Sequence, residues 1–566
     1  MAFKYSLTLL LALTLWASIQ GDAQTSQPHA SPAGTVSTGA AQPAISMDEV
    51  LIRVVAKENE LVSTLANYTP MVETYIQNLQ GDEELGAVPR NDRYFLGKLD
   101  LKEGVNQHSL LNEPGFVGNF KNALTQLYSV RYLANGFAQM ILIDGKSFDR
   151  NNYDFEFVRR EFIGEIKCLV FDVMPKPENK EANFQGRIWV EDQDYNIVRF
   201  NGTYSGSSMS KMYFHFDSWR EQMGPGLWMP AYVYSEESDM GYFFGRRKLH
   251  FKAQTRLWGY NVGRAAAQNE LTSMTVEADR VEDNGDATEH MTPVKSLRAW
   301  ERQAEDNVLQ RLQKARLLAP EGDVEKILET VVTNIEVTNN LNIIPETRTR
   351  VMLTGPLESF SVGHTIVVSR GLIDTLPDEA SLAMVLAHEL AHIALGHRLD
   401  TKYAFNDRML FDDVATFKAI HVKRDEKEEQ EADARAMELL RNSPYKEKLA
   451  NAGLFLRALH NRADQLPNLL RTHMGNPMAQ NKGVKRMADL MQNAPELETT
   501  KVEQIAALPL GGRLRLDPWS NRLEMVKAKP VALLSAREKL PFEVTPIFIY
   551  LTRQKDAAAA ASKNNN

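Results

Sequence analysis

The chain has 566 residues, 43% of them hydrophobic and 24% charged, with a formal net charge of −8 at pH 7. This length accommodates two or three globular domains, and the acidic balance, without a basic cluster able to follow phosphates, excludes nucleic acid as an expected partner. The single cysteine, Cys168, excludes a disulfide framework and is expected to be a buried thiol.

Residues 1–23 have the pattern of a secretory signal peptide. Lys4 precedes an apolar run from Leu7 to Ala17, and Gly21-Asp22-Ala23 supplies small residues at a cleavage-site spacing. The run is short of the ~20 residues that a membrane-spanning helix needs, and no later segment is long and apolar enough to span a bilayer. We therefore expect an exported protein, periplasmic or otherwise extracytoplasmic, without a transmembrane span after signal removal. Residues 24–45 are expected to form a flexible leader because they are rich in Ser, Thr, Ala, Gly and Pro.

Residues 46–282 are predicted to form an antiparallel β domain that begins with one helix. Helical periodicity runs from Asp48 to Ala66, and strand-like patterns then dominate to about residue 260. One long, curved antiparallel sheet is the simplest account of these strands. They are predicted at residues 155–162, 165–173, 186–190, 197–204, 212–216, 231–234 and 248–258.

This β domain weakly resembles LolA-like lipoprotein carriers, in which a curved sheet wraps a helix and leaves an apolar cavity. The resemblance implies a domain that can hold an apolar ligand. The alternative, which we favour because aromatic-rich strands are normally core, is a scaffold whose aromatic side chains fill its own interior. These aromatic residues are Tyr153, Phe155, Trp189, Tyr213 and Phe214.

The remainder of the chain is predicted to hold a mainly helical domain and a small β region, so that the fold class is α+β and multidomain. The acidic, turn-rich residues 282–289 mark the expected boundary. The second domain is expected over residues 296–500 and the C-terminal β region over residues 508–553, as its own sheet or paired with the first domain. The patterns are helical at residues 296–318, 324–339 and 449–495, and strand-like at residues 513–516, 522–525 and 546–551, while residues 554–566 are expected to be disordered.

The most informative motif is His388-Glu389-Leu390-Ala391-His392, which lies in an apolar helical run. Two histidines four residues apart on a helix lie within about 40° of each other on one face, so both imidazoles can bind the same Zn²⁺ ion. Glu389 can take a proton from a water that the metal activates. Upstream, Thr375 is expected to cap this helix, with Pro377 and Asp378 in its first turn. The alternative, a core helix with incidental histidines, would bury three polar side chains at a high cost.

A third zinc ligand is expected from outside this helix. His397 follows His392 by five residues, and a continuous helix would rotate it about 900° from His388 to the opposite face. We interpret it as a histidine at the negative end of the helix dipole. Glu431 is the best candidate ligand because the charged run there gives way to Ala, Met and Leu positions. The alternative is that this charged run is only a solvated helix face.

His388-Glu389-x-x-His392 followed by Glu431-Ala432-Asp433 resembles metallopeptidase family 48, the gluzincins that include the CAAX prenyl endopeptidases and the HtpX-type proteases. The stretch from Phe360 to Ile373 is similar to the strand and turn before that family's active-site helix. Arg471-Thr472-His473 and Arg486 resemble its Thr-His-Pro…Arg segment. The resemblance covers roughly residues 300–495 and implies a zincin-like domain with one Zn²⁺ per chain.

The same resemblance implies a set of site residues. Zn²⁺ would be bound by His388, His392 and Glu431, with Glu389 as the general base and Asp433 as the partner of a ligand. His473 or Arg486 is the leading candidate for stabilising the oxyanion. His473 is left with two further alternatives, a fourth zinc ligand or a surface histidine in a loop.

We therefore predict a zinc-dependent endopeptidase of the bacterial cell envelope that acts on protein or peptide substrates. The strand from Glu358 to Gly363 is predicted to bind substrate by β-addition, which recognises backbone more than sequence. The competing interpretation is a non-proteolytic periplasmic carrier or chaperone for apolar or lipoprotein clients, with a structural zinc site. The presence of Glu389, which a structural site would not need, favours the peptidase.

Overall fold

The computed structural model describes residues 46–102, 106–111, 134–144, 148–177, 184–204, 214–242, 247–260, 292–397, 420, 422–479 and 486–553. Residues 47–566 form one compact unit. The predicted signal peptide, leader, boundary at residues 282–289 and C-terminal tail lie outside the described residues. Within the described part of the chain, no helix combines the length and apolar character needed to cross a membrane.

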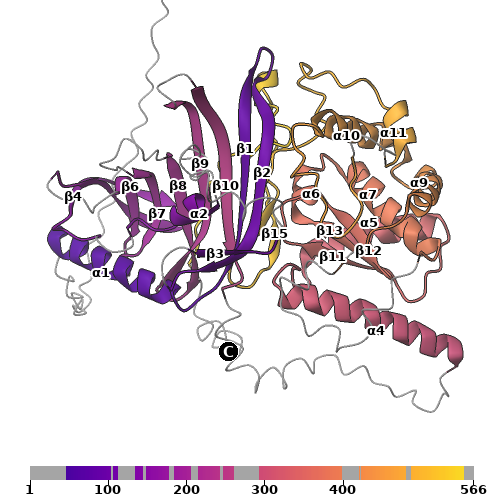
Figure 1. The fold of residues 1–566 in the computed structure, drawn as a ribbon, viewed down its shortest axis with the longest axis horizontal. Coiled ribbons are helices and arrows are strands. Elements are labelled where there is room, and N and C mark those ends of the chain that lie inside the picture. The colour runs from indigo at the N-terminus through magenta and orange to yellow at the C-terminus, as the bar shows by residue number, and fades with distance from the viewer. Residues whose placement is uncertain are drawn as a thin grey trace, which may run out of the picture. The chain divides into compact units, whose positions relative to one another are not determined.

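The N-terminal part of this unit is built on one sheet of ten strands, in the order β3-β2-β1-β10-β9-β8-β7-β6-β5-β4 (Figure 1). All its pairings are antiparallel, and β1 pairs with β10, so that Met71 lies opposite Trp258. The single long antiparallel sheet predicted from the sequence is confirmed. Its strands are β1 (Met71–Asp82), β2 (Gly86–Asp100), β3 (Asn106–Ser109), β4 (Tyr153–Ile163), β5 (Ile166–Pro175), β6 (Phe184–Glu191), β7 (Ile197–Tyr204), β8 (Phe216–Gly224), β9 (Leu227–Tyr242) and β10 (Arg247–Trp258).

Both faces of this sheet carry buried side chains, which the alternation along β1 illustrates, whereas the edge strand β4 is largely exposed. Val72 and Ile76 point into a core shared with helix α1 (Met47–Leu65), while Met71 and Tyr75 point into the core on the opposite face. The short α2 (Ala134–Gln139) also contacts β1. Of the aromatic side chains expected in the interior, Tyr153, Trp189 and Phe214 are buried. Phe155 packs against the core that contains Tyr153 and Phe214, Trp189 belongs to the core on the other face, and Tyr213 lies outside the described residues.

A buried ion pair fixes α1 on the sheet. Both Arg220 Nη atoms donate to the Glu58 carboxylate, at 2.6 and 2.8 Å, and both side chains are almost fully buried. We expect Arg220→Ala to lower the free energy of unfolding by about 3–5 kcal/mol, because Glu58 would remain as an uncompensated buried charge. Urea unfolding measures this change.

The control is Glu60→Ala, which removes the exposed Lys57–Glu60 pair of the same helix. It should change the free energy of unfolding by less than about 1 kcal/mol. Equal effects of the two variants would show that the buried pair does not fix α1.

The C-terminal part of the unit combines helices with a small mixed sheet, in the order β11-β13-β12 (Figure 1). Strand β13 is parallel to β11 and antiparallel to β12, which lies at the edge of this sheet. The elements are α4 (Pro293–Lys314), α5 (Asp323–Thr338), β11 (Arg348–Met352), β12 (Ser359–Val362), β13 (Thr365–Ser369), α6 (Arg370–Thr375), α7 (Glu379–Ala394), α9 (Glu426–Arg441), the 3-10 turn η6 (Lys446–Lys448), α10 (Leu449–Arg462) and α11 (Ala488–Asn493). The helices predicted near residues 296–318 and 324–339 correspond to α4 and α5.

Polar contacts join the two parts through buried carboxylates of the sheet. Glu73 of β1 accepts hydrogen bonds from Tyr94, from the Gly355 backbone and from Arg370 of α6. Asp92 of β2 accepts the backbone N–H of Leu469 at 2.8 Å. These carboxylates hold the segments before α7 and after α10 against the sheet.

The last described segment, residues 508–553, contacts the large sheet. Strands β14 (Leu514–Leu516) and β15 (Leu523–Met525) pair with each other, which is one of the two predicted alternatives, and the 3-10 turn η7 (Ala536–Glu538) follows. The predicted strand at residues 546–551 is absent from the described structure: there the chain makes an isolated hydrogen bond, from Glu165 N to Leu551 O at 2.9 Å, in place of a ladder. Gly164, at φ +63°, permits this approach because a Cβ would lie 2.4 Å from the Leu551 oxygen.

Candidate active site

Helix α7 places the HExxH residues in the interior of the protein. Its apolar residues are buried on all sides, and His388, Glu389 and His392 are each at most 2% exposed. The N-cap is Asp378, whose carboxylate accepts the Ser381 backbone N–H at 2.9 Å. The predicted threonine cap is wrong, because Thr375 is the last residue of α6 and its hydroxyl donates to the carbonyl groups of that helix.

His388, His392 and Glu429 form a group that could hold a metal ion. The Nε2 atoms of the two histidines lie 3.2 Å apart. Glu429 places one carboxylate oxygen 3.4 Å from His388 Nε2 and the other 3.3 Å from His392 Nε2. One ligand atom from each residue lies within 4.8 Å of the others. Two imidazole nitrogens and a carboxylate oxygen are a donor set that suits Zn²⁺ and leaves a further coordination position open.

Helix α9 brings Glu429, and not Glu431, to the histidines. Glu429 and Asp433 are four residues apart and share one helix face, whereas Glu431 is two residues from each and is rotated by about 200°. Asp433 Oδ1 lies 2.8 Å from His388 Nδ1, and its Oδ2 accepts the Met487 backbone N–H at 2.8 Å. The Glu431 side chain is 48% exposed and lies 3.6 Å from Lys427 Nζ. The geometry therefore does not support Glu431 as the third ligand, and it places Asp433 where a partner of a ligand is expected.

His397 contacts His392 instead of lying on the opposite face. The helix ends at Ala394, and Gly396 at φ +73° turns the chain back, so that His397 N donates to the His392 carbonyl at 3.0 Å. The two Nδ1 atoms lie 2.8 Å apart, and His397 Nε2 is 3.5 Å from Glu431. The expectation from helix rotation is wrong because the helix stops before His397. His397 thus contacts the outer nitrogen of His392, as Asp433 contacts that of His388.

The carboxylate of Glu389 is held beside the metal-binding group by two side chains. Ser359 Oγ donates to Glu389 Oε1 at 2.8 Å, and Arg486 Nη1 lies 3.5 Å from the same oxygen. Arg486 also reaches Glu429, at 3.3 Å, and is itself buried. The structure therefore brings Arg486, predicted from the sequence, into contact with the candidate base and the candidate third ligand.

The charges around the group act differently on its three members, and they keep Glu429 in its anionic form. Burial by itself raises the pKa of Glu429, but hydrogen bonds with His388 and His392 and the charge of Arg486 hold that pKa well below its usual range. Burial lowers the pKa of His392. For His388, burial and Arg486 lower the pKa, but its contacts with Asp433, Glu429 and Glu389 outweigh them and raise it. Glu429 is therefore an anionic donor at neutral pH.

His473 lies on a loop fixed by the buried carboxylate of Glu358. Glu358 Oε1 accepts the backbone N–H groups of His473, Met474 and Gly475 at 2.9, 2.6 and 3.1 Å. The ring of His473 lies 6.1 Å from that of Tyr94. Burial lowers the pKa of His473 to about 4, with Arg471 and Lys423 adding to the effect, so the imidazole is neutral at pH 7. The metal-binding group found among the described residues does not contain His473, and its role stays a prediction.

The sequence of residues 319–478 matches the family model of Peptidase family M48. Residues 319–478 are a peptidase family M48 domain. This part of the chain is therefore a zinc-dependent metallopeptidase domain, and it contains His388, Glu389, His392, Glu429 and Asp433. Arg486 lies beyond the matched residues.

Two further comparisons add little to the M48 match. No curated protein matches the chain. A solved DUF1329 family protein from Desulfovibrio piger is 10% identical to it, over 38% of this chain and 95% of that chain, with a TM-score of 0.20. A likeness this weak carries no weight.

Sequence patterns alone missed three residues of the M48 domain site. Glu429 can be found from the sequence, because it precedes Asp433 by four residues. A residue that binds the metal and a residue that supports a neighbouring histidine ligand must lie on the same helix face, and residues four apart do so. Ser359 and Glu358 carry none, since their roles depend on contacts with Glu389 and with the loop at residues 473–475, both distant in sequence.

We expect Asp433→Asn to weaken zinc binding to the M48 domain by about 10- to 100-fold, because a carboxylate on the outer nitrogen orients the His388 ring and raises its basicity. Competition with a chromogenic chelator measures this affinity. Glu438→Gln, at an exposed position of the same helix, is the control and should bind zinc as the wild type does. Equal affinity of all three proteins would mean that Asp433 does not support the metal.

Proposed function

We propose that the protein is a zinc endopeptidase in which His388, His392 and Glu429 hold the metal and Glu389 is the general base. The observation that carries this proposal is the convergence of three ligand atoms within 4.8 Å beside a glutamate held by its own partners. A structural zinc site has no use for such a glutamate. This contrast favours the peptidase over a carrier or chaperone with a structural metal.

Zinc in such a site acts as a Lewis acid that lets water attack a peptide carbonyl at neutral pH. The hydrogen bond from Ser359 and the contact with Arg486 both fall on Glu389 Oε1, which leaves Oε2 to accept the proton of the attacking water. Glu389 then delivers that proton to the leaving amine nitrogen. Ser359 is a positioning residue in this scheme because its hydrogen bond fixes the direction of the carboxylate.

Stabilisation of the oxyanion is assigned to Arg486 first, because its guanidinium already lies in contact with Glu389 and Glu429. His473 is the second candidate, and as a neutral imidazole it would act as a hydrogen-bond donor rather than as a cation. If His473 stabilises the transition state, His473→Ala slows turnover and keeps the metal. If it coordinates the resting metal, the same change speeds turnover.

The proposed targets are protein or peptide substrates of the cell envelope. This proposal depends on the export signal expected at residues 1–23. Strand β12 lies at the edge of its sheet and Ser359 at its start contacts Glu389, so a substrate strand added to this edge would reach the catalytic glutamate.

The test is digestion of casein and of an envelope extract by the purified chain, before and after metal removal. Cleavage that stops with a chelator and returns with stoichiometric Zn²⁺ supports the proposal. A zinc-loaded chain that cleaves neither substrate would instead favour the carrier alternative.

A further inference from the structure

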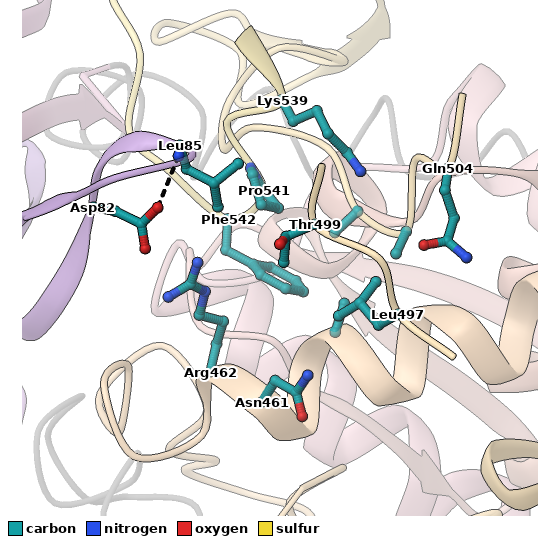
Figure 2. Close-up of a pocket in the computed structure, with 13 residues that line it drawn as sticks. Asp82, Leu85, Asn461, Arg462, Leu497, Thr499, Gln504, Lys539, Pro541 and Phe542 are labelled. Atoms are coloured by element: carbon teal, nitrogen blue, oxygen red, sulfur yellow. Dashed lines mark hydrogen bonds between the residues drawn. The ribbon is translucent and has the colours of Figure 1, made fainter. Parts of the chain in front are cut away.

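Among the pockets lined by described residues, a smaller and a larger one lie outside the metal-binding group. The smaller, of about 260 Å³, lies at the turn between β1 and β2 and the end of α10 (Figure 2). Its polar groups are partly engaged, since Lys539 donates to the Lys501 carbonyl at 2.7 Å and Asp82 accepts the Leu85 N–H at 2.7 Å. The larger pocket, of about 580 Å³, lies between strands β8–β10 and residues 511–550, and its polar lining is less engaged.

Arg256 of β10 lines the larger pocket, and two of its guanidinium nitrogens have no hydrogen-bond partner. Its side chain is buried, with 7% of the residue exposed, and its Nε and Nη2 atoms have no hydrogen-bond partner. Its guanidinium lies 5.4 Å from the centre of the Tyr232 ring. Burial lowers the pKa of Arg256 to about 10, so the group is still a cation at pH 7. A buried cation with unmade hydrogen bonds is costly, which points to a missing anion.

The nearest carboxylates are engaged by other groups. Glu73 pairs with Arg370 at 2.6 Å. Asp374 accepts the backbone N–H groups of Arg513 and Leu514 at 3.1 and 2.9 Å, and it lies 3.8 Å from Arg370. In the described residues neither hydrogen-bonds to Arg256, although the negative charges of both act on it and raise its pKa. The hydrogen-bonding capacity of the guanidinium therefore remains for a ligand.

The wall of the pocket is shaped to admit this guanidinium. Gly511, which also lines the pocket, has φ +78°, and a Cβ there would lie 2.1 Å from Arg256 Nη2. A larger residue would therefore displace the arginine from the wall. Another acid of the lining, Glu221, is paired with Arg515 at 2.9 Å and does not compete for Arg256.

Large apolar side chains are exposed around the same pocket. Met525, Val526, Phe548 and Tyr550 line it and are 37%, 45%, 71% and 61% exposed. Exposed apolar groups next to a concave site mark surfaces that a ligand covers. The pocket thus combines one buried cation with an apolar rim.

We propose that this pocket binds a small amphipathic organic anion, whose acid group pairs with Arg256 and whose apolar body covers Phe548 and Tyr550. Guanidinium groups bind carboxylates and phosphates through charge-assisted hydrogen bonds. The volume lies in the range of small-molecule sites. This site is separate from the peptidase centre, because none of the metal-binding residues lines it.

Isothermal titration of the full chain with decanoate, decyl phosphate, decanol and acetate tests the proposal. Decanoate or decyl phosphate should bind and raise the melting temperature, and comparing these two tells a carboxylate from a phosphate ligand. Decanol lacks the charge and acetate lacks the apolar body, so each should bind at least about tenfold more weakly. Failure of both decyl anions to bind, or equal binding of decanol, would overturn the proposal.

Two variants locate the binding. Arg256→Gln should weaken decyl-anion binding by about tenfold or more, while its melting temperature without ligand stays level or rises and its casein cleavage stays normal. Phe548→Ser, at an exposed position, should weaken binding several-fold because the ligand loses apolar contact. This variant tests the same site without altering a buried side chain. Unchanged affinity in both variants would place the ligand elsewhere and contradict the proposal.

Discussion

Glu429→Gln is expected to lose zinc and peptide hydrolysis together. The change replaces an anionic donor by a neutral amide, and two histidines alone rarely hold the ion. Glu429 is also the carboxylate whose pKa the histidines and Arg486 hold low, so its charge is present throughout the neutral range. Metal content of the dialysed variant, with casein cleavage measured on the same sample, checks this result.

Glu431→Gln is the matched control, since it is the same substitution two residues along the same helix. It should keep about one zinc per chain and most of the activity, because the Glu431 side chain is 48% exposed, contacts His397 at 3.5 Å and is not part of the metal-binding group of the described residues. Loss of zinc from Glu431→Gln, with normal zinc in Glu429→Gln, would reverse the assignment.

Glu389→Gln is expected to keep zinc and to lose at least ~10²-fold in turnover, the usual scale for a positioned general base. The amide retains the shape of the side chain but cannot take a proton from water. Initial rates on a fluorogenic peptide, at equal and measured zinc content, separate the chemical step from metal binding.

The control for this variant is Glu379→Gln, in the first turn of the same helix, where the carboxylate accepts a hydrogen bond from Tyr445 at 2.9 Å. It should cleave at nearly the wild-type rate. Near-normal cleavage by Glu389→Gln would remove Glu389 from the role of base and leave the mechanism without a proton acceptor.

The elements that could be predicted from the sequence are those with local periodicity. Helix α1 matches its predicted range within one residue at each end, and the hairpin of β6 and β7 lies where two alternating runs flank a turn. His388, Glu389 and His392 could be found because their spacing on one helix is itself the chemical signal.

The features that could not be predicted depend on contacts between residues distant in the sequence, or on the residue at which a helix ends. A search for the third ligand by composition selected Glu431, whereas the phase of α9 relative to Asp433 selects Glu429. A helix continued through Gly396 would place His397 on the opposite face, but glycine commonly ends helices, and α7 stops at Ala394. The pocket around Arg256 joins β10 to residues more than 250 positions later in the chain, and no local pattern predicts such a pairing.

The central claim is that His388, His392 and Glu429 hold a catalytic zinc ion, and anomalous diffraction at the zinc edge from crystals of the zinc-loaded chain tests it most directly. We predict one strong anomalous peak, which marks a zinc ion about 2.0–2.2 Å from both histidine Nε2 atoms and from the Glu429 carboxylate, with one coordination position open to water. A peak bonded to Glu431, or a site closed by four protein ligands, would contradict the account.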